Sequence, residues 1–450
     1  MSGGLLTDLY EVTMAASYLR RGMTGPATFS LFVRKLPPDR GFLIAAGLED
    51  CLSFVEDYRF SREDLDYLAA VQGLDDASLG AFGRLRFTGE VRAVPEGRVV
   101  YPGEPLLEVT APIAEAQLVE TVLLNHITFQ TTVATKAARC VRAAAGAQVI
   151  DFSFRRTQGV DAAMAVARAS YLAGFAGTSN VEGARRYGIP ATGTMAHSYV
   201  EAFPGEGEAF DAFAADFPDR TTLLVDTYDT LAGVEAAIRT ARRAGLPSLA
   251  GIRLDSGDLG DLAVKARSML DEAGMTGTRI VASGGLDEHR IADLAAAGAP
   301  IDVYGVGTKM GVSADAPYLD SAYKLVAYEE RPVMKLSTGK INAPCAKQVY
   351  RGADGDVVAL ADEPAPDGME PLLVPVMEAG RRVAGPDPLD AVRERCAAEI
   401  AALPDRITRL RAPESRPVRL SARLRRTRDR LYAELAAGHR AAGGGPLQGR

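Results

Sequence analysis

A chain of 450 residues is long enough for about three domains of roughly 150 residues, or for one large domain with an appendage. Hydrophobic residues make up 47% of the chain and charged residues 24%, which excludes a disordered or fibrous protein. No stretch approaches the ~18 consecutive apolar residues that a membrane-spanning helix needs. The first residues have neither the basic nor the apolar region of a secretory signal. We therefore expect a cytoplasmic protein that does not bind a membrane.

Cysteine and histidine are scarce and scattered. The four cysteines lie far apart without a C-x-x-C pair, so neither a disulfide framework nor a cysteine-rich zinc site is expected. With only four histidines, a multi-histidine metal site would need most of them, and we predict no metal site built by the protein. The net charge is −7, although residues 401–450 hold twelve Arg against four Asp or Glu. We interpret this tail as a solvated helix and expect no nucleic-acid partner, because it lacks interleaved aromatic residues.

The N-terminal part of the chain mixes strand and helix patterns. Residues 28–33 and short segments within 85–110 have the composition of strands, and the latter are separated by Pro and Gly turn signals. Residues 115–135 are typical of a mostly buried helix. We predict an α+β domain over residues 1–135.

From about residue 147, apolar strands alternate with alanine-rich amphipathic helices. The predicted strands are 149–154, 175–178, 191–195, 222–227, 249–254, 279–283 and 301–306. The predicted helices include 230–244, 259–273 and 287–297, each followed closely by glycine, which commonly ends a helix. Alternation of this kind predicts a parallel sheet with right-handed crossovers. Since no G-x-G-x-x-G motif opens the series, we favour an irregular parallel β/α barrel over an open doubly wound sheet, and place it at residues 136–320.

The remaining residues, 321–450, return to short strand patterns and then to a helical tail from about Pro388. We predict that this segment packs back on the N-terminal domain and completes it.

Polar side chains follow nearly every predicted strand of the barrel. In β/α barrels the reactive groups lie at the carboxyl ends of the strands, so this arrangement predicts a site at that edge. The polar strand ends are Asp151 to Arg156, Thr178 to Asn180, Thr194 to Ser198, Asp226 to Thr227, Arg253 to Ser256, Ser283 to Gly285 and Gly305 to Lys309.

Two of these ends are glycine-rich turns on neighbouring strands at the end of the barrel. Glycine lets backbone N–H groups approach an anion closely, and barrel enzymes commonly hold a phosphate behind their last strands. We predict phosphate binding there. The residues concerned are Ser283, Gly284, Gly285, Gly307 and Thr308.

Charged side chains at the other strand ends indicate an anionic substrate. Arg155, Arg156 and Arg253 carry guanidinium groups, which bind carboxylate or phosphate through paired hydrogen bonds. Asp226 and Asp255 could hold ribose hydroxyls or a hydrated magnesium ion, or could instead cap helices. For Asp258 we favour the capping role.

His197 follows the third predicted strand directly and is flanked by Thr194 and Ser198, which can orient an anion. A lone histidine is usually structural, but this setting makes it a candidate functional residue.

Taken together, six motifs resemble those of the nicotinate phosphoribosyltransferases, in the order that this family has them. The resemblance spans roughly residues 5–350. The motifs are residues 7–14 (TDLYEVTM), 151–159 (DFSFRRTQG), 193–198 (GTMAHS), 252–258 (IRLDSGD), 283–285 (SGG) and 305–308 (GVGT).

The resemblance implies a type II phosphoribosyltransferase fold, with an irregular β/α barrel beside an α+β domain. It implies transfer of phosphoribosyl from 5-phosphoribosyl 1-diphosphate to nicotinate with Mg²⁺ as cofactor, coupled to ATP hydrolysis through a phosphorylated histidine, here His197. It also implies a homodimer in which Tyr10 stacks on nicotinate in the neighbouring subunit. The remaining carried-over roles are substrate binding by Thr194 and Arg253 and phosphate binding by Thr308. We also assign Asp255 to catalysis, and Phe154 and Arg155 to substrate binding.

Other functions stay open at this point. One is a nicotinamide or quinolinate phosphoribosyltransferase. Another is a phosphosugar aldolase or isomerase, for which Lys309 is the only well-placed lysine. The third is a non-catalytic protein that senses nucleotides with the same pocket.

Overall fold

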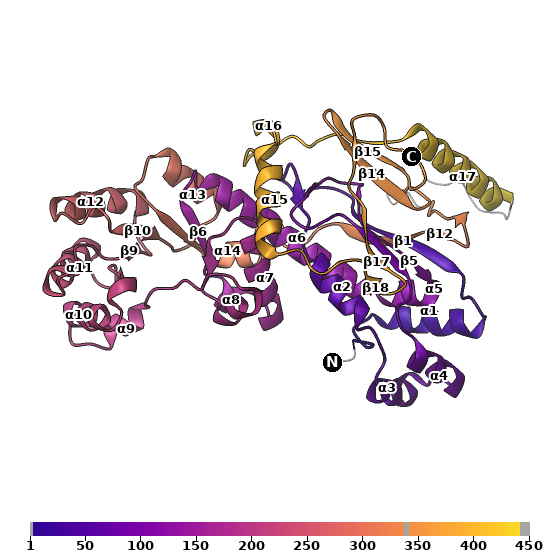
Figure 1. Ribbon diagram of the computed structural model, residues 1–450, viewed down its shortest axis with the longest axis horizontal. Helices are drawn as coiled ribbons and strands as arrows, with labels where there is room; N and C mark the ends of the chain where they lie inside the picture. Colours follow the sequence, from indigo (N-terminus) through magenta and orange to yellow (C-terminus); the bar gives the residue numbers. More distant parts are fainter. Residues whose placement is uncertain (1–2, 337–341, 442–450) are drawn as a thin grey trace. The chain divides into compact units, whose positions relative to one another are not determined.

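The computed structural model describes residues 3–336 and 342–441, so residues 442–450 of the arginine-rich tail lie outside the described residues. Among the described helices, none is both long and apolar enough to cross a membrane. The chain forms two compact units, labelled by their elements in Figure 1. The first unit comprises Met1–Thr131, Tyr318–Pro388 and Ala398–Arg450, and the second comprises Thr132–Pro317 and Leu389–Ala397.

The first unit contains a seven-stranded antiparallel sheet in the order β13-β12-β1-β5-β3-β17-β18. Phe29 and Leu31 of β1 are buried, and the Phe29 ring stacks on Tyr323 of β12 at 4.8 Å between ring centroids. The strands are β1 (Pro26–Val33), β3 (Glu90–Ala93), β5 (Pro105–Pro112), β12 (Ser321–Tyr328), β13 (Arg331–Pro332), β17 (Val374–Glu378) and β18 (Arg381–Arg382).

A smaller sheet and several helices complete this unit. The smaller sheet has the order β16-β14-β15-β19, and β2 pairs with β4 alone. These strands are β2 (Leu43–Ile44), β4 (Val99–Val100), β14 (Lys347–Gly352), β15 (Gly355–Leu360), β16 (Glu370–Pro371) and β19 (Val418–Leu420). The helices are α1 (Leu9–Arg20), α2 (Leu48–Glu56), α3 (Arg62–Gln72), α4 (Asp76–Arg84), α5 (Ile113–Leu118), α16 (Asp405–Thr408) and α17 (Ala422–Ala441). The chain passes between the units within α6 (Glu120–Ala143), between Pro317 and Tyr318, directly before α15 (Leu389–Ala401) and within α15.

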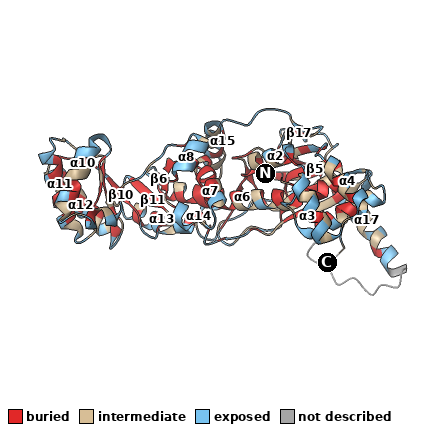
Figure 2. Ribbon diagram, turned by 90° about the horizontal axis from the view of Figure 1, so that it is seen from below, coloured by how far each residue is buried: buried red, intermediate tan, exposed pale blue. Residues whose placement is uncertain are grey.

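The second unit is built on a parallel sheet, as predicted. Its strands are largely buried, whereas α8, α10 and α13 each have some exposed residues (Figure 2). The strands are β6 (Gln148–Asp151), β7 (Gly177–Thr178), β8 (Thr222–Leu224), β9 (Gly251–Leu254), β10 (Arg279–Ala282) and β11 (Val303–Val306). The helices are α7 (Val160–Leu172), α8 (Val181–Tyr187), α9 (His197–Glu201), α10 (Glu206–Asp216), α11 (Thr230–Arg243), α12 (Leu259–Glu272), α13 (Glu288–Ala296) and α14 (Thr308–Gly311), with short 3-10 turns η1 (Phe154–Arg156) and η2 (Pro218–Arg220).

The strand order of this sheet is β7-β6-β11-β10-β9-β8. The first strand, β6, therefore pairs with the last, β11, and the other neighbours follow one another along the chain. The sheet nevertheless has two edges among the described residues, because no ladder joins β8 to the segment that follows β7. The sheet is thus parallel and wound in one direction, without a closed ring of backbone pairing.

The predicted strand at residues 191–195 is wrong. Only Ala191 pairs with the sheet, through an isolated parallel bridge to Thr178. Beyond it the chain leaves the sheet, and Thr194 and Met195 accept hydrogen bonds from Arg253 instead of forming a ladder.

A buried ion cluster joins α6 to α13 in the second unit. Glu288 is 0% exposed and pairs with Lys136 at 2.5 Å and with Arg139 at 3.1 Å. Lys136 also pairs with Asp315 at 2.8 Å. The attraction in such a cluster offsets the cost of removing the charges from water only while each charge keeps its partners.

We predict that Glu288→Ala lowers the free energy of unfolding by about 3 kcal/mol or more, because it leaves Lys136 and Arg139 buried without this carboxylate. Urea denaturation followed by circular dichroism measures the loss. The matched control is Glu272→Ala on the exposed surface of α12, which should change stability by less than about 0.5 kcal/mol. Equal effects of the two variants would contradict a structural role for the cluster.

Candidate active site

Arg253, near the carboxyl end of β9, is the centre of the candidate site. Its side chain is only 12% exposed. Nε donates to Ser283 Oγ at 2.7 Å, and one terminal nitrogen donates to Asp255 Oδ1 at 2.6 Å. The other terminal nitrogen donates to Thr194 Oγ1 at 3.0 Å and to the Met195 carbonyl at 3.3 Å. One guanidinium therefore holds together the end of β9, the end of β10 and the segment after β7.

The register of the sheet explains why Arg253 points to this site. Val281 of β10 pairs with Arg253 on one side and with Val303 of β11 on the other. Directly paired residues of parallel strands project from the same face, so all three lie on one face. The Phe152 ring packs against this face, and the Arg253 guanidinium lies over it at 5.5 Å from the ring centroid. Gly305 makes room for the ring, since a Cβ there would come within 2.5 Å of it.

Asp255 is held as a carboxylate by the groups around it. Its burial acts to raise its pKa, but hydrogen bonds from Ser283 and Arg253, together with the Arg253 charge, lower the pKa overall. Ser283 Oγ donates to Asp255 Oδ1 at 2.5 Å. Gly284 adopts φ +93°, and a Cβ there would lie 2.0 Å from the Asp255 carbonyl oxygen, so only glycine fits this turn.

Asp226, after β8, has one satisfied and one unsatisfied carboxylate oxygen. Oδ2 accepts from the Asp255 backbone N–H at 3.0 Å and from Ser256 Oγ at 2.6 Å. Oδ1 is buried and has no hydrogen-bond partner among the residues that the structure describes, and the same is true of Glu206 Oε1. Burial, and next the charge of Asp226, raise the pKa of Glu206. This pair is therefore suited to bind a cation, a water molecule or a hydroxyl donor.

His197 is the first residue of α9 and is partly buried. Its Nδ1 lies 3.2 Å from Thr227 Oγ1, which follows β8. This contact connects the segment after β7 to β8, the two parts of the sheet that have no ladder between them. It orients the ring and leaves Nε2 as the nitrogen available for chemistry.

Two aspartates near the carboxyl edge of the sheet, Asp151 and Asp258, have structural roles. Asp151 is 1% exposed, and its oxygens accept from the Ser153 backbone N–H at 2.8 Å and from Thr178 Oγ1 at 2.7 Å. Burial raises the pKa of Asp151, against these hydrogen bonds. Asp258 caps α12 by accepting from Gly260 and Asp261, which confirms the preference for capping.

The turn after β6 presents positive charge to solvent. Phe154, Arg155 and Arg156 form the 3-10 turn η1 and are all exposed. The side chains of Arg155 and Arg156 make no hydrogen bond or ion pair with any described residue. They are thus free to bind an anion.

The second glycine turn ends in the short helix α14. Gly307 lies just before it, and Thr308, its first residue, is exposed. The next residue, Lys309, forms an ion pair with Asp287 at 2.6 Å. The Lys309 amine is therefore engaged by a carboxylate.

Tyr10 belongs to the first unit, on α1, whereas the cluster around Arg253 belongs to the second unit. Its side chain is exposed, yet partial burial and the charges of Glu120 and Glu11 raise its pKa. Glu11 beside it is 0% exposed. Burial raises the pKa of Glu11 to about 7, although hydrogen bonds from Thr7 and Thr121 act to lower it.

Some contributors to the site had no assigned role in the sequence analysis. Phe152, Thr227 and Glu206 are side chains of this kind, and the Met195 carbonyl is a backbone group. Phe152 could have been found from its position immediately after β6, at a predicted strand end. A backbone carbonyl carries no sequence signal.

A parallel β/α sheet with a buried arginine, carboxylates and glycine turns at its carboxyl edge is typical of enzymes that act on phosphorylated substrates. Comparison with sequence models of known families identifies the family within this class. Sequence models of the N-terminal domain, the family core and the C-terminal domain of nicotinate phosphoribosyltransferase match residues 5–128, 147–351 and 364–428. The chain belongs to the nicotinate phosphoribosyltransferase family.

Individual relatives agree with this assignment. The chain is 50% identical over 442 residues to the nicotinate phosphoribosyltransferase pncB2 of Mycobacterium tuberculosis, covering 96% of this chain and 93% of that protein. It is 44% identical over 380 residues to the Bacillus subtilis enzyme, covering 81% and 77%. The crystal structure of human nicotinic acid phosphoribosyltransferase superimposes with a TM-score of 0.86 at 31% identity, covering 95% of this chain and all of that one.

We predict that Glu11→Gln changes how stability depends on pH. Folded Glu11 keeps its proton up to about pH 7, whereas an unfolded glutamate loses it near pH 4.3. The unfolded state then binds fewer protons between these values, so the free energy of unfolding of the wild type falls as pH rises through this window. Glutamine has no such proton to lose.

The variant should therefore gain about 2 kcal/mol relative to the wild type between pH 5 and pH 8. Urea denaturation at a series of pH values measures this, with Glu63→Gln on the exposed surface of α3 as the matched control. Parallel pH profiles for Glu11→Gln and the wild type would show that Glu11 ionises normally.

Proposed function

We propose that this chain forms nicotinate mononucleotide and diphosphate from nicotinate and 5-phosphoribosyl 1-diphosphate, a salvage step of NAD biosynthesis. The observation that carries the proposal is the Arg253 cluster at the carboxyl edge of the sheet, in a chain 50% identical over 96% of its length to a nicotinate phosphoribosyltransferase. The ion pair of Lys309 with Asp287 argues against an aldolase, which would need this amine free to attack a substrate carbonyl.

Displacement of diphosphate from the anomeric carbon develops positive character on the ribose and negative charge on the leaving group. The task of the protein is therefore mainly electrostatic. The free guanidiniums of Arg155 and Arg156, and the backbone N–H groups of the turns at Gly284 and Gly307, are suited to hold phosphate groups. No covalent nucleophile on the sugar is needed.

Four contacts engage the Arg253 guanidinium, through Ser283, Asp255, Thr194 and Met195. We propose that the remaining N–H of Arg253 donates to the carboxylate of nicotinate, and that Thr194 makes a second contact with this substrate. Phe154 and the Tyr10 of a neighbouring subunit would enclose the pyridine ring. In this proposal the protein is a homodimer.

Magnesium fits the carboxylates of the site. Among the described residues no group of three or more His, Cys, Asp or Glu side chains could hold a metal ion by itself. The unpartnered Asp226 Oδ1, with Asp255 adjacent, is suited to an ion that keeps most of its waters and arrives with the diphosphate substrate. Bound there, Mg²⁺ would neutralise charge on the leaving group.

We assign the coupling to ATP to His197. With Nδ1 beside Thr227, Nε2 attacks the γ-phosphorus of ATP, the bond to the bridging oxygen breaks, and ADP leaves. Water later hydrolyses the phosphohistidine. Phosphoryl charge near Arg253 and the glycine turns would then alter the affinity for the other substrates.

We also propose that the parallel sheet closes as an irregular barrel. The first and last strands already pair, and the remaining opening lies between β8 and the segment after β7. The hydrogen bond between His197 and Thr227 crosses this opening. Arg253 donates a second hydrogen bond to Thr194 on the same segment. Side chains would thus replace the missing ladder.

The proposed reaction predicts that nicotinate is preferred over nicotinamide by roughly 10⁴-fold in kcat/KM, because an amide gives the remaining N–H of the Arg253 guanidinium no anionic partner. Diphosphate release measured in parallel with nicotinate, nicotinamide and quinolinate, with and without ATP, tests this. Comparable turnover of nicotinamide, or release of diphosphate only with quinolinate, would contradict the proposal.

The role of His197 predicts that γ-labelled ATP transfers an acid-labile, base-stable label to the enzyme. His197→Ala should abolish both the label and ATP hydrolysis while retaining slow, ATP-independent nucleotide formation, because the phosphoribosyl site remains. His289→Ala on α13 is the matched control and should keep the label. Label that persists in His197→Ala would place the phosphorylated residue elsewhere.

A further inference from the structure

The two glycine turns of the candidate site follow the neighbouring strands β10 and β11. The ladder between these strands ends with the pair of Ala282 and Tyr304, and both turns begin after this pair. The first turn comprises residues 283–287 and the second comprises residues 305–308. The distance between the two turns is therefore set by contacts other than the ladder between β10 and β11.

Each turn is attached to the strand on its other side. The Ser283 backbone N–H donates to the Leu254 carbonyl of β9 at 2.8 Å, and Ser283 Oγ accepts from Arg253 of the same strand. In the second turn, the Val306 carbonyl accepts from the backbone N–H of Phe152, which follows β6, at 2.9 Å. The first turn is thus fixed to β9 and the second to the end of β6.

Lys309 and Asp287 connect the two turns. Lys309 lies in α14, directly after Thr308 of the second turn, and Asp287 is the last residue of the first turn. Lys309 Nζ donates to Asp287 Oδ2 at 2.6 Å. Asp287 Oδ1 accepts from the Arg290 backbone N–H at 2.9 Å, so the same carboxylate also caps α13. Because each oxygen has its own partner, the carboxylate is held in one orientation.

The Asp287 carboxylate is charged near neutral pH. Burial acts to raise its pKa, but hydrogen bonds from the Arg290 backbone and from Lys309, together with the Lys309 charge, lower the pKa overall. The side chains of Lys309 and Asp287 are 47% and 17% exposed, and an ion pair open to solvent contributes little to the stability of a fold. The pair is therefore better suited to set the local position of the turns than to stabilise the unit.

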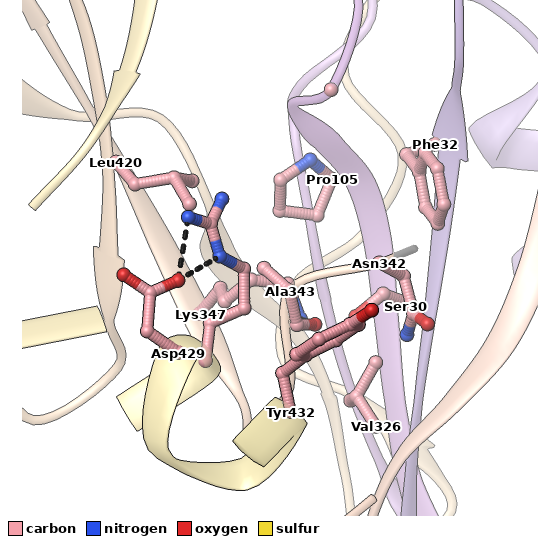
Figure 3. A pocket seen from close by; sticks show the side chains of 12 residues that line it. Ser30, Phe32, Pro105, Val326, Asn342, Ala343, Lys347, Leu420, Asp429 and Tyr432 are labelled. Atoms are coloured by element: carbon pink, nitrogen blue, oxygen red, sulfur yellow. Dashed lines mark hydrogen bonds and ion pairs between the residues drawn. The ribbon is translucent and has the colours of Figure 1, made fainter. Parts of the chain in front are cut away.

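The two residues of this pair come from separate segments, which distinguishes it from a local ion pair. Arg428 and Asp429, beside a cavity of the first unit, are consecutive residues of α17 (Figure 3). Breaking that pair would leave the path of the chain unchanged, because the hydrogen bonds of the helix hold both residues. Breaking the pair of Lys309 and Asp287 would release one glycine turn from the other.

We propose that Lys309 and Asp287 are positioning residues for the transferase reaction, an inference that rests on the proposed function. Their ion pair holds the two glycine turns at the separation at which the backbone N–H groups of both turns reach the phosphate groups of 5-phosphoribosyl 1-diphosphate. Lys309 keeps Asp287 as its partner and acts on the substrate only through the turns. Such positioning matters because a shift of about 1 Å in a binding group can cost on the order of 100-fold in rate.

Isothermal titration of the full chain with 5-phosphoribosyl 1-diphosphate and Mg²⁺ tests the proposal in two variants. Lys309→Met keeps the length of the side chain, Asp287→Asn keeps a residue that caps α13, and each removes the ion pair. Both should weaken binding at least about tenfold, because both release the turns. The double variant should bind no more weakly than the weaker single variant, since either change alone already breaks the pair.

These two variants separate positioning from other roles of the lysine. Lys309→Met makes the site more negative and Asp287→Asn makes it more positive. An effect of charge alone, or a direct contact of Lys309 with phosphate, would therefore change the affinity in opposite directions. Positioning weakens binding in both variants. In steady-state assays, KM for 5-phosphoribosyl 1-diphosphate should rise in both, while KM for nicotinate should stay within about twofold of the wild type.

Two further variants serve as controls. Lys309→Arg can still pair with Asp287 and should bind within about threefold of the wild type. Lys265→Met breaks a pair with Asp261 within α12, where both side chains are 53% exposed, and should leave the affinity unchanged. Circular dichroism melts establish that each variant is folded. If Asp287→Asn does not fold, Lys309→Met and its rescue by Lys309→Arg decide the outcome.

The proposal is overturned by unchanged or tighter binding in either single variant, by additive losses in the double variant, or by an equal rise in KM for nicotinate. A loss in Lys309→Arg as large as that in Lys309→Met also contradicts it. A wild type that binds 5-phosphoribosyl 1-diphosphate but releases no diphosphate with nicotinate contradicts the proposed function alone, because the affinities of the variants still measure the positioning of the turns. A wild type that does not bind this substrate contradicts both.

Discussion

The arrangement of the candidate active site depends on the burial of one positive charge. A guanidinium that is only 12% exposed loses most of its hydration. The free-energy cost of removing this charge from water is offset only if oxygen atoms surround the group. For Arg253 these oxygens come from three separate parts of the chain, at Thr194, Asp255 and Ser283. The need to satisfy this one group fixes the relative positions of the segments that would surround a substrate.

Local patterns in the sequence located most elements of the parallel sheet. The helix predicted at 230–244 is observed at Thr230–Arg243, because hydrophobic spacing and a terminal glycine act over a few residues. The strand predicted at 191–195 failed for a non-local reason. Its polar groups accept hydrogen bonds from Arg253, some sixty residues away. The local sequence contains no sign of this distant interaction. Whether the two edges of the sheet meet is likewise decided by distant segments.

At the site, the sequence identified which residues gather but not what each one does. Two D-x-x-D runs show why. In both, the first aspartate, Asp226 or Asp255, belongs to the polar cluster, and the second, Asp229 or Asp258, caps the following helix. The spacing separates the two roles, because a capping residue stands directly before its helix. For Asp151, in contrast, no sequence spacing predicts the role. Only the three-dimensional contacts show that both oxygens of its carboxylate already accept hydrogen bonds from neighbouring residues.

The pairing of β1 has a consequence for synthesis of the chain on the ribosome. One edge of β1 pairs with β5, which follows closely, but its other edge pairs with β12, which begins at Ser321. At translation rates of about 5 to 20 residues per second, β12 emerges about 15 to 60 s after β1. During that interval the apolar β1 has an open edge, which can pair with strands of other chains. In the second unit the longest such delay is about half as long, because β6 pairs with β11, which begins at Val303. Aggregation of nascent chains is thus a hazard of the first unit, and one that a chaperone covering this edge would relieve.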